Sequence, residues 1–130
     1  MSKKVVFVCI HNSCRSVMAE AIFNFYAEEW VAESAGVEKA DKIDSTAIRM
    51  LDEAGYKVEK ERPRTLDEVD LEDFDLIVTV CEESCPYIPT SKPVRHWPLE
   101  DPVGKSEENY NRVMGEIEQK VKELINEVEK

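Results

Sequence analysis

A cysteine and an arginine near the amino terminus enclose a short polar segment, Cys9-Ile10-His11-Asn12-Ser13-Cys14-Arg15-Ser16. If this segment is a loop, its backbone N–H groups can surround an anion, and the Arg15 guanidinium can bind that anion with two parallel hydrogen bonds. The same positive surroundings favour the thiolate form of Cys9, and Ser16 can donate a further hydrogen bond to the sulfur. These residue types therefore predict an enzyme that acts on an oxyanion with a cysteine nucleophile.

The residues on either side of this segment predict a strand before it and a helix after it. The run Val5-Val6-Phe7-Val8 is short, continuously apolar, and made of β-branched and aromatic residues, which is typical of a buried parallel strand. From Val17 the apolar residues recur at helical spacing, at Met18, Ala21, Ile22, Phe25 and Tyr26. The helix would direct the positive end of its dipole at the mouth of the loop. The spacing alone also suits a buried structural cysteine and a surface arginine, but the flanking elements favour the anion site.

The length and net charge of the chain limit the possible domain organisation and partners. The 130 residues predict one domain, 1–130, and the net charge of −11 argues against nucleic acid or an anionic membrane surface as a partner. An anionic substrate must therefore be bound by a local site. No long apolar run or cleavable leader is recognisable, so we expect no membrane association and a cytoplasmic location. Four cysteines in such a chain predict catalytic or metal chemistry rather than a disulfide framework.

Strands and helices are expected to alternate along the rest of the chain. Further strands are predicted at 31–36, 75–80 and 93–97, and further helices at 45–54 and from 106 or 107 to about 128. This alternation predicts an α/β fold, a three-layer sandwich around a four-stranded parallel sheet. Ligands of such sheets bind at the carboxyl ends of the strands. This rule predicts that Cys9, Cys81, Cys85 and Asp101 lie close together at the carboxyl edge of the sheet.

A second pair of cysteines follows the interior strand, in Cys81-Glu82-Glu83-Ser84-Cys85-Pro86. One helical turn would place the two Cα atoms about 6 Å apart, within reach of a disulfide. The two cysteines can form a redox-active disulfide, or they can be buried structural residues. A reactive Cys9 at the same edge of the sheet favours the redox-active disulfide. The spacings fit zinc knuckles poorly, so we expect no metal.

Asp101, in Leu99-Glu100-Asp101-Pro102, is the candidate general acid. A departing oxygen needs a proton, which a carboxylic acid on a loop above the anion can supply. The alternative is a solvated loop aspartate, one of 28 acidic residues.

Taken together, these residues resemble the low-molecular-weight tyrosine phosphatase superfamily and, within it, the thioredoxin-coupled arsenate reductases. Val17 follows Ser16, where the phosphatases usually have proline. Val103-Gly104 follows Asp101-Pro102, where the phosphatases usually place aromatic residues. The cysteines after the interior strand and the pair His96-Trp97 before the Asp-Pro loop are also as in the reductases.

The resemblance implies a relay of three cysteines without a cofactor. Cys9 would attack the arsenic of arsenate, held by the loop amides and Arg15, while Asp101 protonates the departing oxygen. Cys81 would then attack Cys9 and release arsenite, and Cys85 would resolve the bond to give a Cys81–Cys85 disulfide that thioredoxin reduces. Cys14 corresponds to a cysteine that shapes the loop. We expect a monomer with arsenate as substrate and phosphate as its analogue.

Two alternative functions and one question about a bound ion stay open at this point. A phosphatase of phosphotyrosine or a small phosphoester would share Cys9, Arg15 and Asp101, and arsenate and phosphate are near-isosteric. A non-enzymatic redox or metal-responsive protein would use none of these steps. Some members of the superfamily also bind a potassium ion through residues that match Asn12, Glu20, Ser34 and a fourth position. That position is Arg64 here, so the arginine can instead supply the positive charge.

Overall fold

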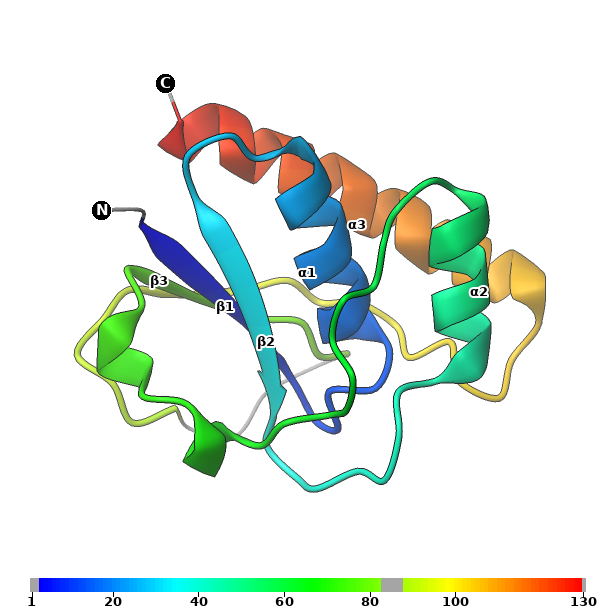
Figure 1. The fold of residues 1–130 in the computed structure, drawn as a ribbon, viewed down its shortest axis with the longest axis horizontal. Helices are drawn as coiled ribbons and strands as arrows, with labels where there is room; N and C mark the ends of the chain where they lie inside the picture. The colour runs from blue at the N-terminus through cyan, green and yellow to red at the C-terminus, as the bar shows by residue number, and fades with distance from the viewer. Residues whose placement is uncertain (1–2, 83–87, 130) are drawn as a thin grey trace.

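The computed structural model describes residues 3–82 and 88–129, in which strands and helices alternate (Figure 1). The elements are β1 (Lys4–Cys9), α1 (Arg15–Tyr26), β2 (Val31–Gly36), α2 (Ser45–Glu53), the short 3₁₀ turns η1 (Leu66–Glu68) and η2 (Leu71–Asp73), β3 (Leu76–Thr79), β4 (Val94–His96) and α3 (Glu107–Val128). The predicted strands and α-helices are confirmed to within a few residues at their ends. The capping-box spacing of Thr65 and Glu68 predicts a brief helical turn, which is η1, whereas η2 was not predicted.

The four strands form one parallel sheet in the order β2-β1-β3-β4. The predicted α/β fold with a four-stranded parallel sheet is therefore confirmed. Because all strands run in the same direction, the carboxyl ends of β1, β3 and β4 lie on one edge of the sheet. Figure 1 shows α1 and α3 packed side by side on one face, while the turns η1 and η2 lie on the other.

The pleat of β1 decides which face its side chains reach. Val5, Phe7 and Cys9 pack into the larger core with the helices, whereas Val6 and Val8 pack with the other face. The residues from Val5 to Val8 are fully buried, and each such side chain contributes about 1.5–3 kcal/mol to folding. The alternation therefore places the Cys9 side chain on the side of α1.

Side-chain caps fix where α2 and α3 begin. Asp44 accepts a hydrogen bond of 3.2 Å from the backbone of Ala47 and another of 2.6 Å from the Tyr110 hydroxyl on α3. Ser106 caps α3 by accepting from the backbone of Asn109 at 3.3 Å. The cap of α2 thus also ties this helix to α3.

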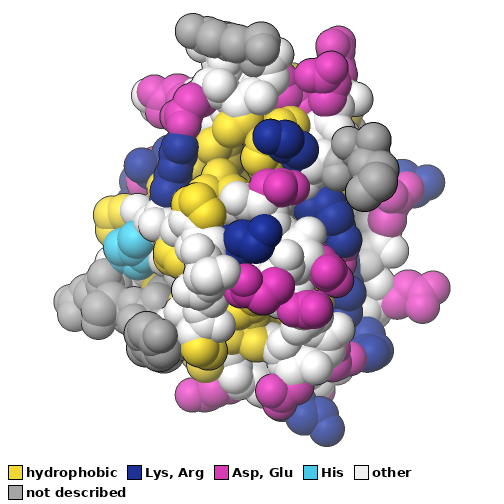
Figure 2. Space-filling model, turned by 90° about the vertical axis from the view of Figure 1, so that its left-hand side faces the viewer, with side chains coloured by type: hydrophobic (Ala, Val, Ile, Leu, Met, Phe, Trp, Pro, Cys, Tyr) yellow, Lys and Arg dark blue, Asp and Glu magenta, His cyan; other side chains and the backbone are white. Residues whose placement is uncertain are grey.

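The surface mixes charges of both signs. On the face drawn in Figure 2, Asp and Glu side chains are interspersed with Lys and Arg around a strip of apolar atoms. Within residues 3–82 and 88–129, no helix is both long enough and apolar enough to cross a membrane.

Candidate active site

The Cys9 thiol lies at the carboxyl end of β1 and is almost fully buried, as a free cysteine. Its Sγ is 2.8 Å from the hydroxyl oxygen of Ser16, at the start of α1. The backbone N–H of Asn12 donates to the same sulfur at 3.1 Å. Both contacts can stabilise negative charge on sulfur, as a thiolate nucleophile requires.

Carbonyl groups of the loop point outward, toward the segment that follows β2. Three carbonyl oxygens of the loop accept hydrogen bonds from the segment after β2. These bonds run from Val37 to Cys9 (3.0 Å), from Glu38 to Ile10 (2.7 Å) and from Asp44 to Ser13 (2.9 Å). In a trans peptide the N–H points opposite to the C=O, so the N–H groups that follow these carbonyls turn the other way. Such an arrangement is suited to bind an anion.

Asn12 is the residue that gives the loop its curvature. It is fully buried and has a φ of 52°, in the left-handed region that asparagine tolerates better than most residues. Its side-chain nitrogen donates to the Ser16 hydroxyl at 2.9 Å, and its side-chain oxygen accepts from the backbone N–H of Arg64 at 2.9 Å. The loop is thereby fastened to the helix on one side and to the segment before η1 on the other.

Gly36, the last residue of β2, leaves room for this loop. A Cβ added there would lie 2.7 Å from the carbonyl carbon of His11 and 2.8 Å from the nitrogen of Asn12. Gly36→Ala is therefore expected to displace the loop backbone, weakening phosphate binding by about tenfold or more and lowering stability by about 1–3 kcal/mol. Calorimetric titration with phosphate and thermal unfolding check both effects.

Gly115→Ala is the matched control, because a Cβ added there, in the middle of α3, would meet nothing within 4 Å beyond the nearby backbone of its own helix. There alanine should stabilise the helix by about 0.5–1 kcal/mol and leave phosphate binding unchanged. If Gly36→Ala behaved like this control, the loop would not depend on the close approach.

Arg15 and Asp101 come together at the same edge. The Arg15 guanidinium is buried, donates to the backbone oxygen of Leu99 at 3.0 Å, and lies 3.8 Å from the Asp101 carboxylate. The Asp101 side chain is about half exposed, at 48%. The acid candidate can therefore reach a ligand held by the arginine while it remains in contact with water.

Cys81 is placed on this edge by the loop after β4. It is buried, and its backbone oxygen accepts a hydrogen bond of 3.0 Å from the N–H of Leu99, the residue whose carbonyl holds Arg15. Cys85 lies outside the described residues, so its place relative to Cys81 stays a prediction.

Cys14 shares the loop with Cys9 but has a different environment. Burial raises the pKa of the Cys14 thiol, and the carboxylates of Asp44 and Asp101 raise it further. Cys14 is therefore a neutral thiol at physiological pH and is unsuited to be the nucleophile.

A lysine that the sequence analysis did not single out lies beside α1. The Lys60 ammonium contacts Glu20 and Ser34, two of the residues for which the resemblance implies a potassium ion. These residues therefore do not offer potassium a free set of oxygen ligands. The Arg64 guanidinium pairs directly with Glu33. Burial raises the pKa of Glu20 overall, although the charge of Arg64 also acts to lower that pKa. In the part of the chain that the structure describes, no three His, Cys, Asp or Glu side chains gather as a metal site.

Comparisons with known proteins agree on the relatives of this chain. Residues 4–130 match the family model for low molecular weight phosphotyrosine protein phosphatase. Arsenate reductase 2 of Staphylococcus saprophyticus subsp. saprophyticus is 38% identical over 129 residues, covering 95% of this chain and 98% of that protein. The crystal structure of arsenate reductase from Archaeoglobus fulgidus DSM 4304 is similar with a TM-score of 0.90 at 61% identity, covering 94% of this chain and 98% of that one. A thioredoxin-dependent arsenate reductase of Corynebacterium glutamicum is similar with a TM-score of 0.79 at 28% identity, covering 98% of this chain and 62% of that one.

Proposed function

This chain belongs to the low molecular weight phosphotyrosine protein phosphatase family, and from that premise we propose that it reduces arsenate to arsenite with Cys9 as nucleophile. The observation that carries the proposal is the buried Cys9 thiol in a loop whose N–H groups and Arg15 suit a tetrahedral oxyanion. Relatives named arsenate reductase, at 38% and 61% identity, support arsenate as the oxyanion.

In the first step the Cys9 thiolate attacks arsenic, forming an S–As bond as one As–O bond breaks. The departing oxygen takes a proton from Asp101 and leaves as water. Arg15 holds the remaining oxygens through its fixed guanidinium. The distance of 3.8 Å between Arg15 Nη2 and Asp101 Oδ2 supports these roles, because one small anion can touch both groups.

In the second step the Cys81 thiolate attacks the sulfur of Cys9. The S–As bond breaks and its electron pair stays on arsenic, which leaves as arsenite, while a Cys9–Cys81 disulfide forms. Cys85 then attacks Cys81, frees the Cys9 thiolate and leaves a Cys81–Cys85 disulfide. Leu99 contacts both Arg15 and Cys81 through its backbone, which supports a role for Cys81 beside the oxyanion loop.

Thioredoxin is the proposed reductant of that last disulfide. The similar enzyme of Corynebacterium glutamicum is named thioredoxin-dependent, and a dithiol protein matches the two-electron exchange. Such a cycle needs a compartment that keeps thiols reduced, so we place the enzyme, acting as a monomeric single domain, in the cytoplasm.

A phosphatase is the second candidate, because the family model itself describes phosphotyrosine phosphatases. It would use Cys9, Arg15 and Asp101 in the same roles and would need neither Cys81 nor Cys85. Weak hydrolysis of aryl phosphates is expected in either case.

The deciding experiment incubates reduced protein with arsenate, with and without thioredoxin, thioredoxin reductase and NADPH. Without the reductant we expect a single round of arsenite release with loss of two thiols per chain, mapped to Cys81 and Cys85. With the reductant, release should continue. No arsenite, together with brisk hydrolysis of an aryl phosphate, would instead establish the phosphatase.

Asp101→Asn tests the acid. The amide cannot donate the proton of a carboxylic acid, so the first round of arsenite release should slow by about 10²–10³-fold. Rapid-quench measurement of that round reports the step directly. Asp52→Asn, at an exposed position on α2, is the control and should keep the normal rate. An unchanged rate for Asp101→Asn would remove the acid role.

A further inference from the structure

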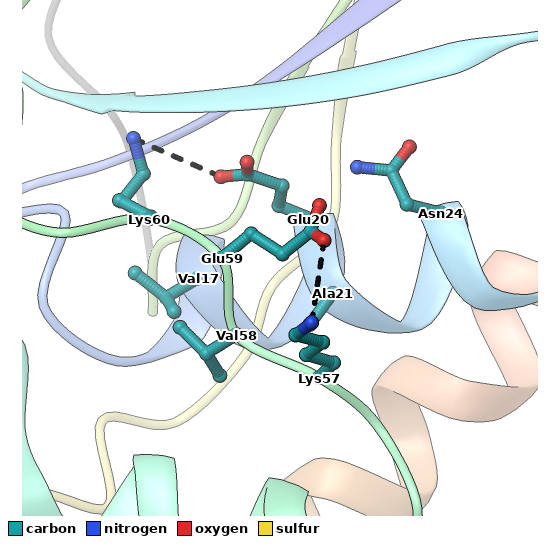
Figure 3. A pocket seen from close by; sticks show the side chains of 8 residues that line it. All are labelled: Val17, Glu20, Ala21, Asn24, Lys57, Val58, Glu59 and Lys60. Atoms are coloured by element: carbon teal, nitrogen blue, oxygen red, sulfur yellow. Dashed lines mark ion pairs between the residues drawn. The ribbon is translucent and has the colours of Figure 1, made fainter.

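A mostly buried ion pair lies next to the oxyanion loop, between α1 and the segment that contains residues 57–60 (Figure 3). Lys60 Nζ is 3.8 Å from Glu20 Oε1, and only 7% and 20% of the two side chains are exposed. Lys60 also donates a hydrogen bond of 3.2 Å to the backbone oxygen of Ser34, and the Ser34 hydroxyl donates to Glu20. The ammonium thus lies among carboxylate and carbonyl oxygens, the ligand types that hard cations take in proteins.

We propose that Lys60 is a built-in monovalent cation that holds the oxyanion loop in place, so that this chain needs no free potassium ion. An ammonium group carries the same single positive charge as potassium. It already contacts Glu20 and Ser34, whereas the Arg64 guanidinium binds Glu33 at 2.7 Å. The inference concerns charge balance beside the loop. Its thermal-unfolding test is independent of the activity proposed above, whereas the expected loss in kcat/KM rests on that activity.

The two contacts of the ammonium belong to elements that also hold the loop. Glu20 lies one helical turn after Ser16, so its side chain is on the same face of α1 as the hydroxyl that contacts the catalytic sulfur. Ser34 lies two residues before Gly36, the position at which β2 almost touches the loop backbone. The ion pair therefore joins the helix and the strand between which the loop is suspended.

The chain after Lys60 completes the connection. Four residues later, the backbone N–H of Arg64 donates to the Asn12 side chain, and the backbone oxygen of Arg64 accepts from Gly36 at 2.7 Å. Asn12 in turn donates its own N–H to the sulfur of Cys9. Anchoring Lys60 thus fixes the segment that keeps Asn12 in its left-handed conformation. Lys60 is a positioning residue, because it acts on the reacting atoms through Asn12.

Neither charge of the pair is stable without the other. Burial raises the pKa of Glu20 and lowers the pKa of Lys60, so each group is costly to ionise alone. Removing one partner leaves an uncompensated charge in a poorly hydrated place. A pocket of about 40 Å³ adjoins the pair, so a shortened side chain would open room for a small cation.

The test compares Lys60→Ala with Lys57→Ala. Lys57 is the matched control because it also faces a glutamate, Glu59 at 4.0 Å, but is 84% exposed. Thermal unfolding of reduced protein is measured in potassium chloride, methylammonium chloride and choline chloride at equal ionic strength. In choline, Lys60→Ala should lose about 5–10 °C in Tm and about tenfold in kcat/KM for arsenate. Potassium or methylammonium should restore at least half of the Tm loss.

Wild type and Lys57→Ala should show the same Tm in all three salts. Potassium-specific stabilisation of the wild type would overturn the proposal, and so would a Tm of Lys60→Ala that is unchanged or equally low in every salt. If Lys60→Ala does not fold, the single variant Lys60→Met is compared with the double variant Lys60→Met, Glu20→Gln to test the proposal. The double variant removes both charges and should unfold at a higher temperature than the single one in choline, and a lower Tm would refute the proposal.

Discussion

Replacing Cys9 with serine is expected to abolish arsenate reduction, lowering kcat/KM by at least about 10⁴-fold. A serine hydroxyl at this position is a far weaker nucleophile than a thiolate. Among the described residues, no histidine contacts Cys9, so no imidazole is placed to take the proton of the serine hydroxyl. Arsenite release by the reduced variant, followed with the thioredoxin system present, measures the loss.

Phosphate binding separates chemistry from structure in this variant. The loop amides and Arg15 are retained, so calorimetric titration of Cys9→Ser with phosphate should give an affinity within about tenfold of the wild type. Arsenite release above about one per cent of the normal rate would mean that another group attacks arsenic. Loss of phosphate binding as well would mean that the sulfur is needed to shape the loop.

The fold was readily predictable because local patterns and packing agree. The apolar run at Val5 to Val8 fills the centre of the sheet, and the Asp44 and Ser106 caps begin the helices where expected. The turn η2 (Leu71–Asp73) was missed since it buries no residue of its own. Its only local signal is Asp70, whose side chain accepts from the backbone of Glu72 at 3.1 Å.

The active site was predictable only where its residues are neighbours in sequence. The Cys9–Ser16 contact spans seven positions and follows from a strand-to-helix loop. The Glu20–Lys60 pair joins residues forty positions apart, and Lys60 stands between Glu59 and Glu61, a pattern typical of a solvated loop. Only the tertiary structure shows that this one lysine of the charged run turns inward.

The position of Arg64 shows the same limit. The sequence allowed Arg64 to supply the positive charge near Glu20. In the structure Arg64 contacts Glu33 of β2. The side chains of Glu33 and its neighbour Ser34 lie on opposite faces of the sheet. Burial alone would raise the pKa of Glu33, but its contacts with Arg64 and Lys4 lower that pKa overall. Strand alternation therefore gives Arg64 a direct contact with Glu33, whereas the direct ionic contact of Glu20 is with Lys60.

Replacing Cys81 or Cys85 with serine is expected to abolish sustained arsenate reduction without affecting phosphate hydrolysis. Under the proposed relay, Cys85→Ser completes one round and stops, with one arsenite per chain and a Cys9–Cys81 disulfide. Cys81→Ser should stop earlier, with arsenic still bound to Cys9, because no thiol is placed to break the S–As bond. Steady-state reduction should fall by at least about 10³-fold in both variants.

Aryl phosphate hydrolysis is the internal control for these two variants, since it needs Cys9, Arg15 and Asp101 but no second thiol. Both should hydrolyse p-nitrophenyl phosphate at the wild-type rate, and mass mapping after one round with arsenate should find Cys9 and Cys81 linked only in Cys85→Ser. Sustained arsenite release by Cys85→Ser would exclude the relay. Loss of hydrolysis together with reduction would show instead that the cysteines after β3 support the oxyanion loop, and the two activities could then not be separated at this site.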